Sequence, residues 1–379
     1  MSEWKKVTLD QMGIISRGRS RHRPRNDARL FGGKYPFIQT GDIGAAGLYI
    51  TKYSQTYNEE GLSQSKLWDK DTLCITIAAN IADTALLAFP ACFPDSVMGF
   101  IPFENIANVK FVKYCFDILQ KDCQQISQGT AQDNLSWEKL STILFPCPPI
   151  EVQNKIATVL SSYDSLIENY QKQIKLLEEA AQRLYKEWFV DLRFPGHETT
   201  KIVDGVPEGW NKKTLGEITP IKTGKKDANF GNVDGEYPFF TCAQEPIKSP
   251  SYSFDTSAVI LAGNGDFNVK LYRGKFEAYQ RTYVLEPNNT NMLYLLFFCV
   301  SENMNRLATG ASGSTIKFLT KGMIESLDLY EPTNAILCAF NKIIDPTQGQ
   351  KENLLTQVRH LTEARDRLLP KLMSGEIEI

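Results

Sequence analysis

The chain has 379 residues, of which 42% are hydrophobic and 23% charged, a composition typical of a globular protein with room for two hydrophobic cores. It shows neither a secretory leader nor an apolar run long enough to span a bilayer, so we expect a cytoplasmic protein without membrane contact. Eight cysteines without CxxC spacing and only three histidines argue against disulfides and zinc, and a net charge of −2 restricts any nucleic-acid surface to local basic clusters.

Residues 1–147 are predicted to form a first globule that mixes strands and helices. Short apolar runs bounded by turn residues predict strands at 73–77, 84–89 and 143–145. A longer apolar run predicts a helix at 111–120. This mixture is typical of an α+β domain, although it does not fix the order of the strands.

The segment from Ser16 to Leu30 is rich in arginine, with glycine, serine and proline in between and only Asp27 opposing the positive charge. Such a segment is either a solvated loop or a contact for DNA phosphates, and a basic cluster at the corresponding place in the second half of the chain favours the contact. Gln39 and Thr40, which flank a later turn, are candidates for reading base edges. The predicted phosphate contacts in the first globule are Arg17, Arg19, Arg21, Arg23 and Arg25.

Residues 148–196 are predicted to form a long central helix. From Ile156 to Trp188, apolar or small residues recur at alternating steps of four and three, which is a heptad seam. A helix of about 40 residues would be roughly 60 Å long, which is too long for the core of one globule. Pro148 and Pro149 fit its first turn. Its predicted seam residues are Ile156, Leu160, Ile167, Ile174, Leu177 and Leu184.

Residues 197–331 are predicted to form a second globule, with strands at 258–261 and 281–285 and a helix at 292–303. Glycine and asparagine at 263–265 indicate a tight loop between two strands. The predicted phosphate contacts of this globule are Lys222, Lys225 and Lys226. The polar residues near turns that we predict to read bases are Asn264, Asn268, Gln280 and Arg281.

Residues 332–379 are predicted to form a second long helix that pairs with the first. Arg365 interrupts its seam, and Pro346 with Gly349 is expected to break the helix near its start. An isolated heptad helix would expose its seam to water, so the two long helices are expected to cover each other. The predicted seam residues of the second helix are Leu354, Val358, Leu361 and Leu368.

The two halves of the chain repeat each other. The start of the first globule, Trp4 to Leu9, recurs as Trp210 to Leu215, and the tripeptide 35–37 recurs as 237–239. The turn at Gly129 matches the turn at Gly310, and residues 179–184 match 363–368 at an offset of 184 positions. The sequence therefore predicts two tandem α+β domains and two long helices that pack as an antiparallel coiled coil around a pseudo-twofold axis.

Three stretches together resemble the specificity subunit of Type I restriction-modification systems. They are residues 35–43 (YPFIQTGDI), 184–196 (LYKEWFVDLRFPG) and 367–377 (RLLPKLMSGEI). The resemblance implies target-recognition domains at 1–147 and 197–331, each reading one half of a split, asymmetric DNA target with an unspecified gap. It also implies that the helices at 148–196 and 332–379 act as a spacer and as a dock for partner subunits. The family's Glu-Gln pair near the start of each long helix is matched by 148–153 but not by 332–334.

The partners that the resemblance implies are double-stranded DNA, two methyltransferase subunits and restriction subunits that act as translocases. S-adenosylmethionine, ATP and Mg²⁺ are then expected in the partner subunits, and this chain is expected to bind no cofactor or metal and to have no catalytic residues of its own.

Other classes of protein are less well supported by the residues. There is no phosphate-binding GxxxxGK[ST] loop, and the Pro148-Pro149 motif lacks the acceptor residue and the glycine-rich cofactor turn of an amino-methyltransferase. The alternative that the heptads alone would favour is a coiled-coil scaffold with two protein-binding globules. The basic loops at equivalent positions favour a DNA-binding protein, and a steep loss of DNA affinity with salt would distinguish the two.

Overall fold

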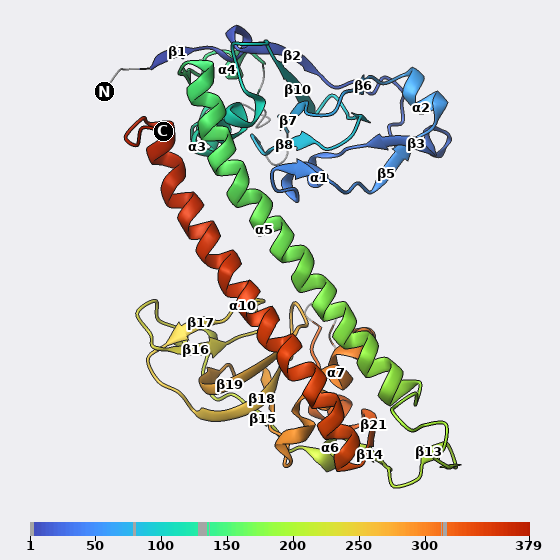
Figure 1. Ribbon diagram of the computed structural model, residues 1–379. Coiled ribbons are helices and arrows are strands. Elements are labelled where there is room, and N and C mark those ends of the chain that lie inside the picture. The colour runs from blue at the N-terminus through green and yellow to red at the C-terminus, as the bar shows by residue number, and fades with distance from the viewer. Residues whose placement is uncertain (1–3, 79–80, 128–134, 136, 312, 314–316) are drawn as a thin grey trace. The chain divides into compact units, whose positions relative to one another are not determined.

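The computed structural model describes residues 4–78, 81–127, 135, 137–311, 313 and 317–379 (Figure 1). The chain divides into two compact units, one formed by residues 1–172 and 354–379 and the other by residues 173–353. Unit 1 therefore contains the first globule and both ends of the chain, and unit 2 contains the second globule. Both long helices, α5 (Ile150–Tyr185) and α10 (Asn334–Met373), contribute residues to both units.

The globule of unit 1 is built on two sheets. In its described residues, one sheet has the order β2-β10-β7-β8-β4, a second has the order β5-β3-β9-β6, and β1 pairs with β11. The bounds of the larger sheet are β2 (Gly13–Arg17), β10 (Val97–Pro102), β7 (Leu73–Thr76), β8 (Thr84–Leu87) and β4 (Tyr49–Ile50). The other strands are β5 (Gln55–Tyr57), β3 (Phe31–Phe37), β9 (Ala91–Cys92), β6 (Leu67–Trp68), β1 (Lys5–Val7) and β11 (Phe145–Cys147). The helices of the globule are α1 (Thr40–Gly44), α2 (Glu59–Ser63), α3 (Val109–Ser127) and α4 (Trp137–Leu140).

The globule of unit 2 repeats this plan. Its main sheet has the order β15-β20-β18-β19-β16-β17, and β14 pairs with β21. The strands are β15 (Ile221–Thr223), β20 (Thr282–Leu285), β18 (Phe254–Ala262), β19 (Val269–Ala278), β16 (Tyr237–Phe240), β17 (Ile247–Ser249), β14 (Asn211–Thr214) and β21 (Asp328–Glu331). A small hairpin, β12 (Ile202–Val203) with β13 (Val206–Pro207), precedes them. The helices are α6 (Leu215–Ile218), α7 (Leu293–Glu302), α8 (Met304–Gly310) and α9 (Lys321–Glu325).

Strand pairing confirms the internal repeat. The order β2-β10-β7-β8 in unit 1 matches β15-β20-β18-β19 in unit 2. The strand that carries the Tyr-Pro-Phe motif pairs antiparallel with a strand that follows it, β5 in unit 1 and β17 in unit 2, and parallel with a later one, β9 or β19. The antiparallel pair of β1 with β11 is matched by that of β14 with β21. The predicted match between the turns at Gly129 and Gly310 falls partly on residues 128–134, which lie outside the described residues.

Most predicted elements are present with shifted ends. The predicted strands at 73–77, 84–89, 258–261 and 281–285 correspond to β7, β8, β18 and β20, and the tight loop at 263–265 connects β18 to β19. The predicted helix at 111–120 is the middle of the longer α3, and the one at 292–303 is α7. The strand predicted at 143–145 begins only at Phe145, because its register is set by pairing with β1.

The two long helices run antiparallel within each unit. In unit 1, Lys155 of α5 donates to the backbone of Ile379, and further along α5 the carboxylate of Asp164 lies 2.6 Å from the guanidinium of Arg365. In unit 2, Lys351 lies 3.4 Å from Glu178, and the rings of Trp188 and Phe340 are 5.8 Å apart. The α10 partner moves toward the N-terminus as the α5 residue moves toward the C-terminus, which confirms the predicted pairing.

The predicted seam faces inward along both helices. Its buried members are Ile156, Leu160, Ile167, Ile174 and Leu354, and its half-buried members are Leu177, Leu184, Val358, Leu361 and Leu368. Toward the ends of the helices the seam merges with the cores of the globules. In unit 1, Ile156 and Leu160 of α5 join Leu372 and Met373 of α10 in one cluster with the main sheet and α3. The seam is therefore part of the core of each unit.

The prediction that Pro346 and Gly349 break the last helix is wrong, because α10 is continuous from Asn334 to Met373. Both residues lie on the exposed side of the helix. A proline in a helix interior costs about 3 kcal/mol, whereas burial of each large apolar side chain contributes roughly 1.5–3 kcal/mol. Packing therefore outweighs the local preference, and the buried residues that supply it are Leu337, Phe340 and Ile344.

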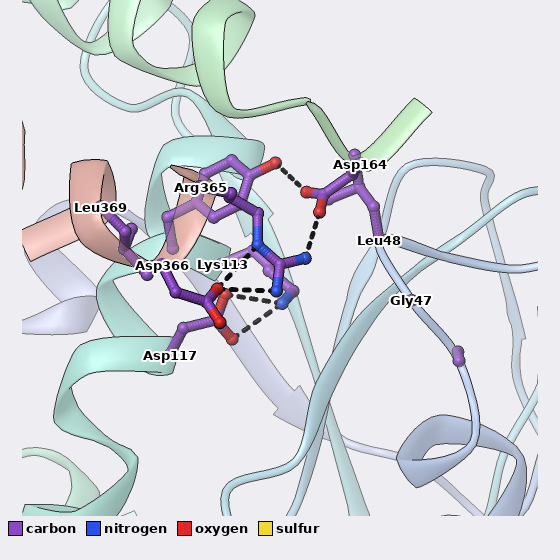
Figure 2. A pocket seen from close by; sticks show the side chains of 10 residues that line it. Gly47, Leu48, Lys113, Asp117, Asp164, Arg365, Asp366 and Leu369 are labelled. Carbon is purple, nitrogen blue, oxygen red and sulfur yellow. Dashed lines mark hydrogen bonds and ion pairs between the residues drawn. The ribbon is translucent and has the colours of Figure 1, made fainter. Parts of the chain in front are cut away.

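Arg365 interrupts the seam inside unit 1, where it joins a network of charged residues beside a pocket of about 410 Å³ (Figure 2). Its guanidinium donates to Asp164, and the hydroxyl of Tyr114 donates to the same carboxylate over 2.5 Å. Burial and the charge of Asp164 raise the pKa of Tyr114 well above its ordinary value, so the phenol remains a donor. Nearby, Lys113 pairs with Asp117 at 2.7 Å. The network joins α3, α5 and α10.

We expect Arg365→Ala to lower the free energy of unfolding by about 1–3 kcal/mol, because Asp164 would lose one of its two partners in a half-buried place. Urea unfolding of the full chain measures this loss. Arg359→Ala is the matched control, since Arg359 lies exposed on α10 and no partner of its side chain is seen among the described residues; its effect should stay within about 0.5 kcal/mol. Equal effects of the two substitutions would contradict the role given to Arg365.

Candidate nucleic-acid interface

The arginine-rich loop of unit 1 follows β2 and is fixed by backbone hydrogen bonds. The amide of Gly18 donates to Val97 over 2.8 Å, and the amide of Arg19 donates to Phe93 over 3.1 Å. A Cβ atom on Gly18 would lie 2.3 Å from the carbonyl oxygen of Pro94, so only glycine allows this close approach. The first part of the loop therefore has a defined conformation.

Three of the five predicted arginines have partners that hold the loop together. Arg19 donates to the carbonyl of Ser65 over 2.9 and 2.5 Å. Arg23 donates to the carbonyls of Ser20 and His22, and Arg25 pairs with Asp95 at 2.7 Å. These three side chains are thus committed to contacts within the protein.

Arg17 and Arg21 differ from the other three. Both are exposed, and among the described residues neither guanidinium has a hydrogen-bond or ion-pair partner. Further along, the carboxylate of Asp27 already pairs with Arg29 at 2.8 Å, and hydrogen bonds with Arg29 and His22 hold the pKa of this carboxyl well below the usual range. The positive charge that remains available in this loop is centred on Arg17 and Arg21.

Lys66 adds a cation that we did not predict from the sequence. Its ammonium lies 3.5 Å from the centroid of the Trp68 ring and 3.5 Å from the hydroxyl of Ser16 at the end of β2. Burial and the neighbouring charge of Arg19 lower the pKa of Lys66. Nothing near Lys66 in the sequence indicates this location, because tertiary packing alone brings it to the loop.

The predicted lysines of unit 2 also differ from one another. Lys222 pairs with Glu286 at 2.7 Å, and that hydrogen bond, with a second one from Thr256, lowers the pKa of Glu286. The ammonium of Lys226 lies 4.3 Å from the centroid of the Phe230 ring. Lys225 is exposed, and no partner of its side chain is seen among the described residues. Of the three, Lys225 is the best placed to contact a phosphate.

In unit 1 the two predicted base-reading residues lie at the start of α1. Gln39 precedes the helix, and its side-chain amide donates to the side chain of Gln55 over 2.6 Å. Thr40 is the first residue of α1 and is half-buried, without a side-chain partner among the described residues. The structure therefore leaves the hydroxyl of Thr40 more available than the amide of Gln39.

In unit 2 the four predicted base-reading residues come together on neighbouring loops. Two of them are committed to the loops themselves: Asn268 donates to Cys242 and Asp266 and accepts from Lys270, and Gln280 donates to Asp227 over 3.0 Å. The other two, Asn264 and Arg281, have no side-chain partner in the described part of the chain.

Gln244 belongs to the same group of loops, although we did not predict it as a site residue. Its side-chain amide donates to Asp266 over 2.6 Å from an exposed position. It lies in the loop after β16, which corresponds to the loop of Gln39 after β3 in the other globule. The duplication of the strand order, rather than any local motif, is what could have identified it.

The described residues contain no group of three or more histidine, cysteine, aspartate or glutamate side chains arranged to hold a metal ion. No helix in the same part of the chain combines the length and apolar character needed to cross a membrane.

The family model for the Type I restriction modification DNA specificity domain matches residues 1–179 and 207–353, which is most of the chain. The chain belongs to the Type I restriction-modification specificity subunits. Members of this family recognise DNA targets, which agrees with exposed cations on the loops of both globules.

Individual relatives of this specificity subunit are similar over different lengths. It is 38% identical over 178 residues to the EcoDI specificity subunit of Escherichia coli, a match that covers 45% of this chain and only 39% of that protein. It is 26% identical to the MjaIX specificity subunit of Methanocaldococcus jannaschii, with 100% and 94% covered. The solved S subunit from M. genitalium has the same fold, with a TM-score of 0.67, 18% identity and coverage of 97% and 96%.

We expect the double substitution Arg17→Ala and Arg21→Ala to weaken binding to all duplexes to a similar degree. Phosphate contacts carry no sequence information, and each lost contact should flatten the slope of log affinity against log salt by about 0.9. Fluorescence anisotropy of the assembled complex at several salt concentrations measures both effects. Arg25→Ala is the control, because Arg25 already pairs with Asp95. An equal change of the slope in the control would contradict the conclusion that Arg17 and Arg21, and not Arg25, are available to contact phosphates.

Proposed function

We propose that this specificity subunit reads a bipartite, asymmetric DNA target, with one half-site for each globule and an unspecified gap between them. The observation that carries the proposal is the duplication of one strand order in both globules with different side chains on equivalent loops. Equivalent frameworks favour the same mode of binding, and different loop residues favour different half-sites. Exposed loop cations that have no partner among the described residues support phosphate contact in both globules.

The long helices are the proposed spacer. α5 has 36 residues and α10 has 40. At ~1.5 Å per residue, each is a rod of more than about 50 Å. A rod of fixed length that carries a reading domain would select half-sites at a fixed separation, which is the physical basis of an unspecified gap of constant length.

The helices are also the proposed dock for two methyltransferase subunits, with restriction subunits joining that complex. Each unit exposes large apolar side chains on its helical segments: Leu166 and Leu355 in unit 1, and Leu176 and Ile343 in unit 2. Exposed apolar residues on helices whose seam is already covered are suited to a further protein contact. Their occurrence in both units supports one dock for each methyltransferase subunit.

Catalysis is assigned to the partners in this proposal, as is binding of S-adenosylmethionine, ATP and Mg²⁺. The chain would act in the cytoplasm as a non-catalytic DNA-binding component. The alternative of a protein-binding scaffold predicts weak DNA binding with little dependence on the sequence of the duplex, so the salt titration above also tests this alternative.

We expect the purified chain alone to neither methylate nor cleave DNA, because its sequence lacks the phosphate loop and the complete methyltransferase motif. Transfer of a radioactive methyl group from S-adenosylmethionine to DNA measures the first activity, with the chain plus its methyltransferase as positive control. Methylation by the chain alone at the rate of the complex would refute the assignment.

The spacer role is tested by lengthening both helices by one heptad. A second copy of residues 166–172 would follow Lys172, and a second copy of residues 350–356 would follow Thr356, which keeps the antiparallel partners opposite each other. Each helix would grow by ~10 Å, or about three base pairs. Sequencing of methylated DNA from cells that express the complex should show both half-sequences unchanged and the gap about three pairs wider.

The matched control carries the insertion in α5 alone. Its unpaired heptad should lower the stability of the subunit and give a smaller change of the gap. A methylated motif in which a half-sequence changes while the gap stays constant would mean that the helices take part in base reading, and the spacer proposal would fail.

A further inference from the structure

Arg281 lies where the loops of unit 2 meet. Its backbone carbonyl accepts a hydrogen bond from the amide of Gly263 over 2.9 Å and one from the thiol of Cys242 over 3.6 Å. The amide of Gly224 donates to the next residue, Thr282, over 3.2 Å. Loops that follow β15, β16 and β18 are therefore all tied to the backbone at Arg281 or its neighbour, which fixes the position from which its side chain emerges.

Two glycines allow the loops to approach each other so closely. A Cβ atom on Gly263 would lie 2.4 Å from the carbonyl oxygen of Arg281, and one on Gly224 would lie 1.9 Å from that of Ala278. Neither contact is possible for a residue with a side chain unless the backbone moves. The close packing of these loops around Arg281 thus depends on glycine at two positions of the sequence.

Most of the other charged side chains around Arg281 are committed within the protein. Asp227 and Asp266 accept from glutamine side chains, and Lys270 donates to the carbonyl of Ala243 over 2.9 Å. The segment between α8 and α9 also meets these loops, because the amide of Leu319 donates to the carbonyl of Gly263 over 2.8 Å. Among the described residues of these loops and of that segment, the exposed cations without a partner are Arg281, Lys225 and Lys317.

These three cations differ in what they can recognise. A lysine ammonium is a point charge that suits phosphate, whereas the planar guanidinium of arginine presents two parallel donors. That geometry matches the O6 and N7 acceptors of guanine in the major groove and is the commonest specific contact between proteins and DNA. A fixed backbone position adds what base reading requires, because a mobile arginine would satisfy any nearby acceptor.

We propose that Arg281 determines the specificity of the second globule by reading one guanine of its half-site. The inference rests on the proposed function and deepens it, since it names the base that one side chain recognises. In this arrangement Lys225 and Lys317 contact phosphates and carry no sequence information.

The other globule has a serine at the equivalent place. The amide of Ile77 donates to the carbonyl of Ser96 over 3.0 Å, as Gly263 does to Arg281, and Gly18 donates to the following Val97 as Gly224 does to Thr282. The two frameworks are therefore the same at this position, and only the side chain differs. The proposed guanine contact therefore belongs to only one of the two half-sites. Arg281→Ser is the substitution to test, because it introduces the residue that the other globule has at the equivalent position.

The test uses the complex of the full chain with its methyltransferase. Methylated motifs from cells that express wild-type, Arg281→Ser, Arg281→Lys or Lys225→Ala subunits are compared by genome sequencing. With Arg281→Ser, one guanine in one half-site should lose its preference by roughly 10- to 100-fold, while the other half-site and the gap stay unchanged. Arg281→Lys keeps the charge but lacks the pair of parallel donors, so the same guanine should lose a smaller part of its preference. With Lys225→Ala, the motif should be unchanged and DNA affinity lower.

An unchanged motif with Arg281→Ser would overturn the proposal, and so would an equal loss of affinity for all sequences, which would place the arginine on a phosphate. Thermal unfolding of each variant identifies a folding defect, and Arg281→Lys keeps the test informative if Arg281→Ser does not assemble. Failure of the proposed function gives a different result, because the wild-type complex would then produce no bipartite motif at all.

Discussion

The fold depends on burying one apolar stripe along each long helix. In unit 1, residues of α5 and α10 enter the same core as the main sheet and α3, and in unit 2 the other segments of these helices do the same with α7. The core of unit 1 therefore combines two separate stretches of the chain, whereas the core of unit 2 lies in one stretch, 173–353, that includes segments of both long helices. The same burial aligns the helices, because antiparallel pairing is what brings Ile156 next to Leu372 and Trp188 next to Phe340. The DNA reading that we propose for the loops at the sheet ends would depend on this support.

Within the duplicated framework, several equivalent positions carry opposite chemistry. The offset of 184 positions relates Arg365 to Ala181, so one copy places an ion pair where the other places a methyl group. It also relates Gln153, whose buried amide donates to the carbonyls of Ile106 and Pro148, to the buried Leu337. The missing Glu-Gln pair of the second copy is thus replaced by apolar packing, and α10 forms without it.

The long-range organisation was predictable because it is written as periodicity and repetition. The heptad seam, the duplicated Trp and Tyr-Pro-Phe motifs and the tight loop at 263–265 all correspond to observed features. Pro346 was misjudged because its local cost is outweighed by burial on the opposite face of α10. Packing of a side chain from elsewhere in the chain, as with Lys66 over Trp68, leaves no trace in local sequence.

The sequence predicted which types of side chain lie in the loops, but not which of these side chains have partners within the protein. Composition identified the arginines of the first loop but could not separate Arg21, which is unpaired among the described residues, from Arg25, which is held by Asp95. The same holds for Asn268 and Arg281, which look alike as polar turn residues. Their different roles follow from hydrogen bonds that exist only in the folded protein.

The two ends of the chain share unit 1. The backbone of Ile379 accepts a hydrogen bond from Lys155 on the first long helix, and the ring of Trp4 lies against Gly375, where an added Cβ would be 3.2 Å away. In unit 2 the ring of Trp210 lies against Phe194, just after the end of the other helix. Each tryptophan thus fills the same kind of junction, once within one stretch of sequence and once between segments that are far apart in the chain. The packing of the tryptophan ring, and not the continuity of the backbone, is therefore what the two junctions have in common.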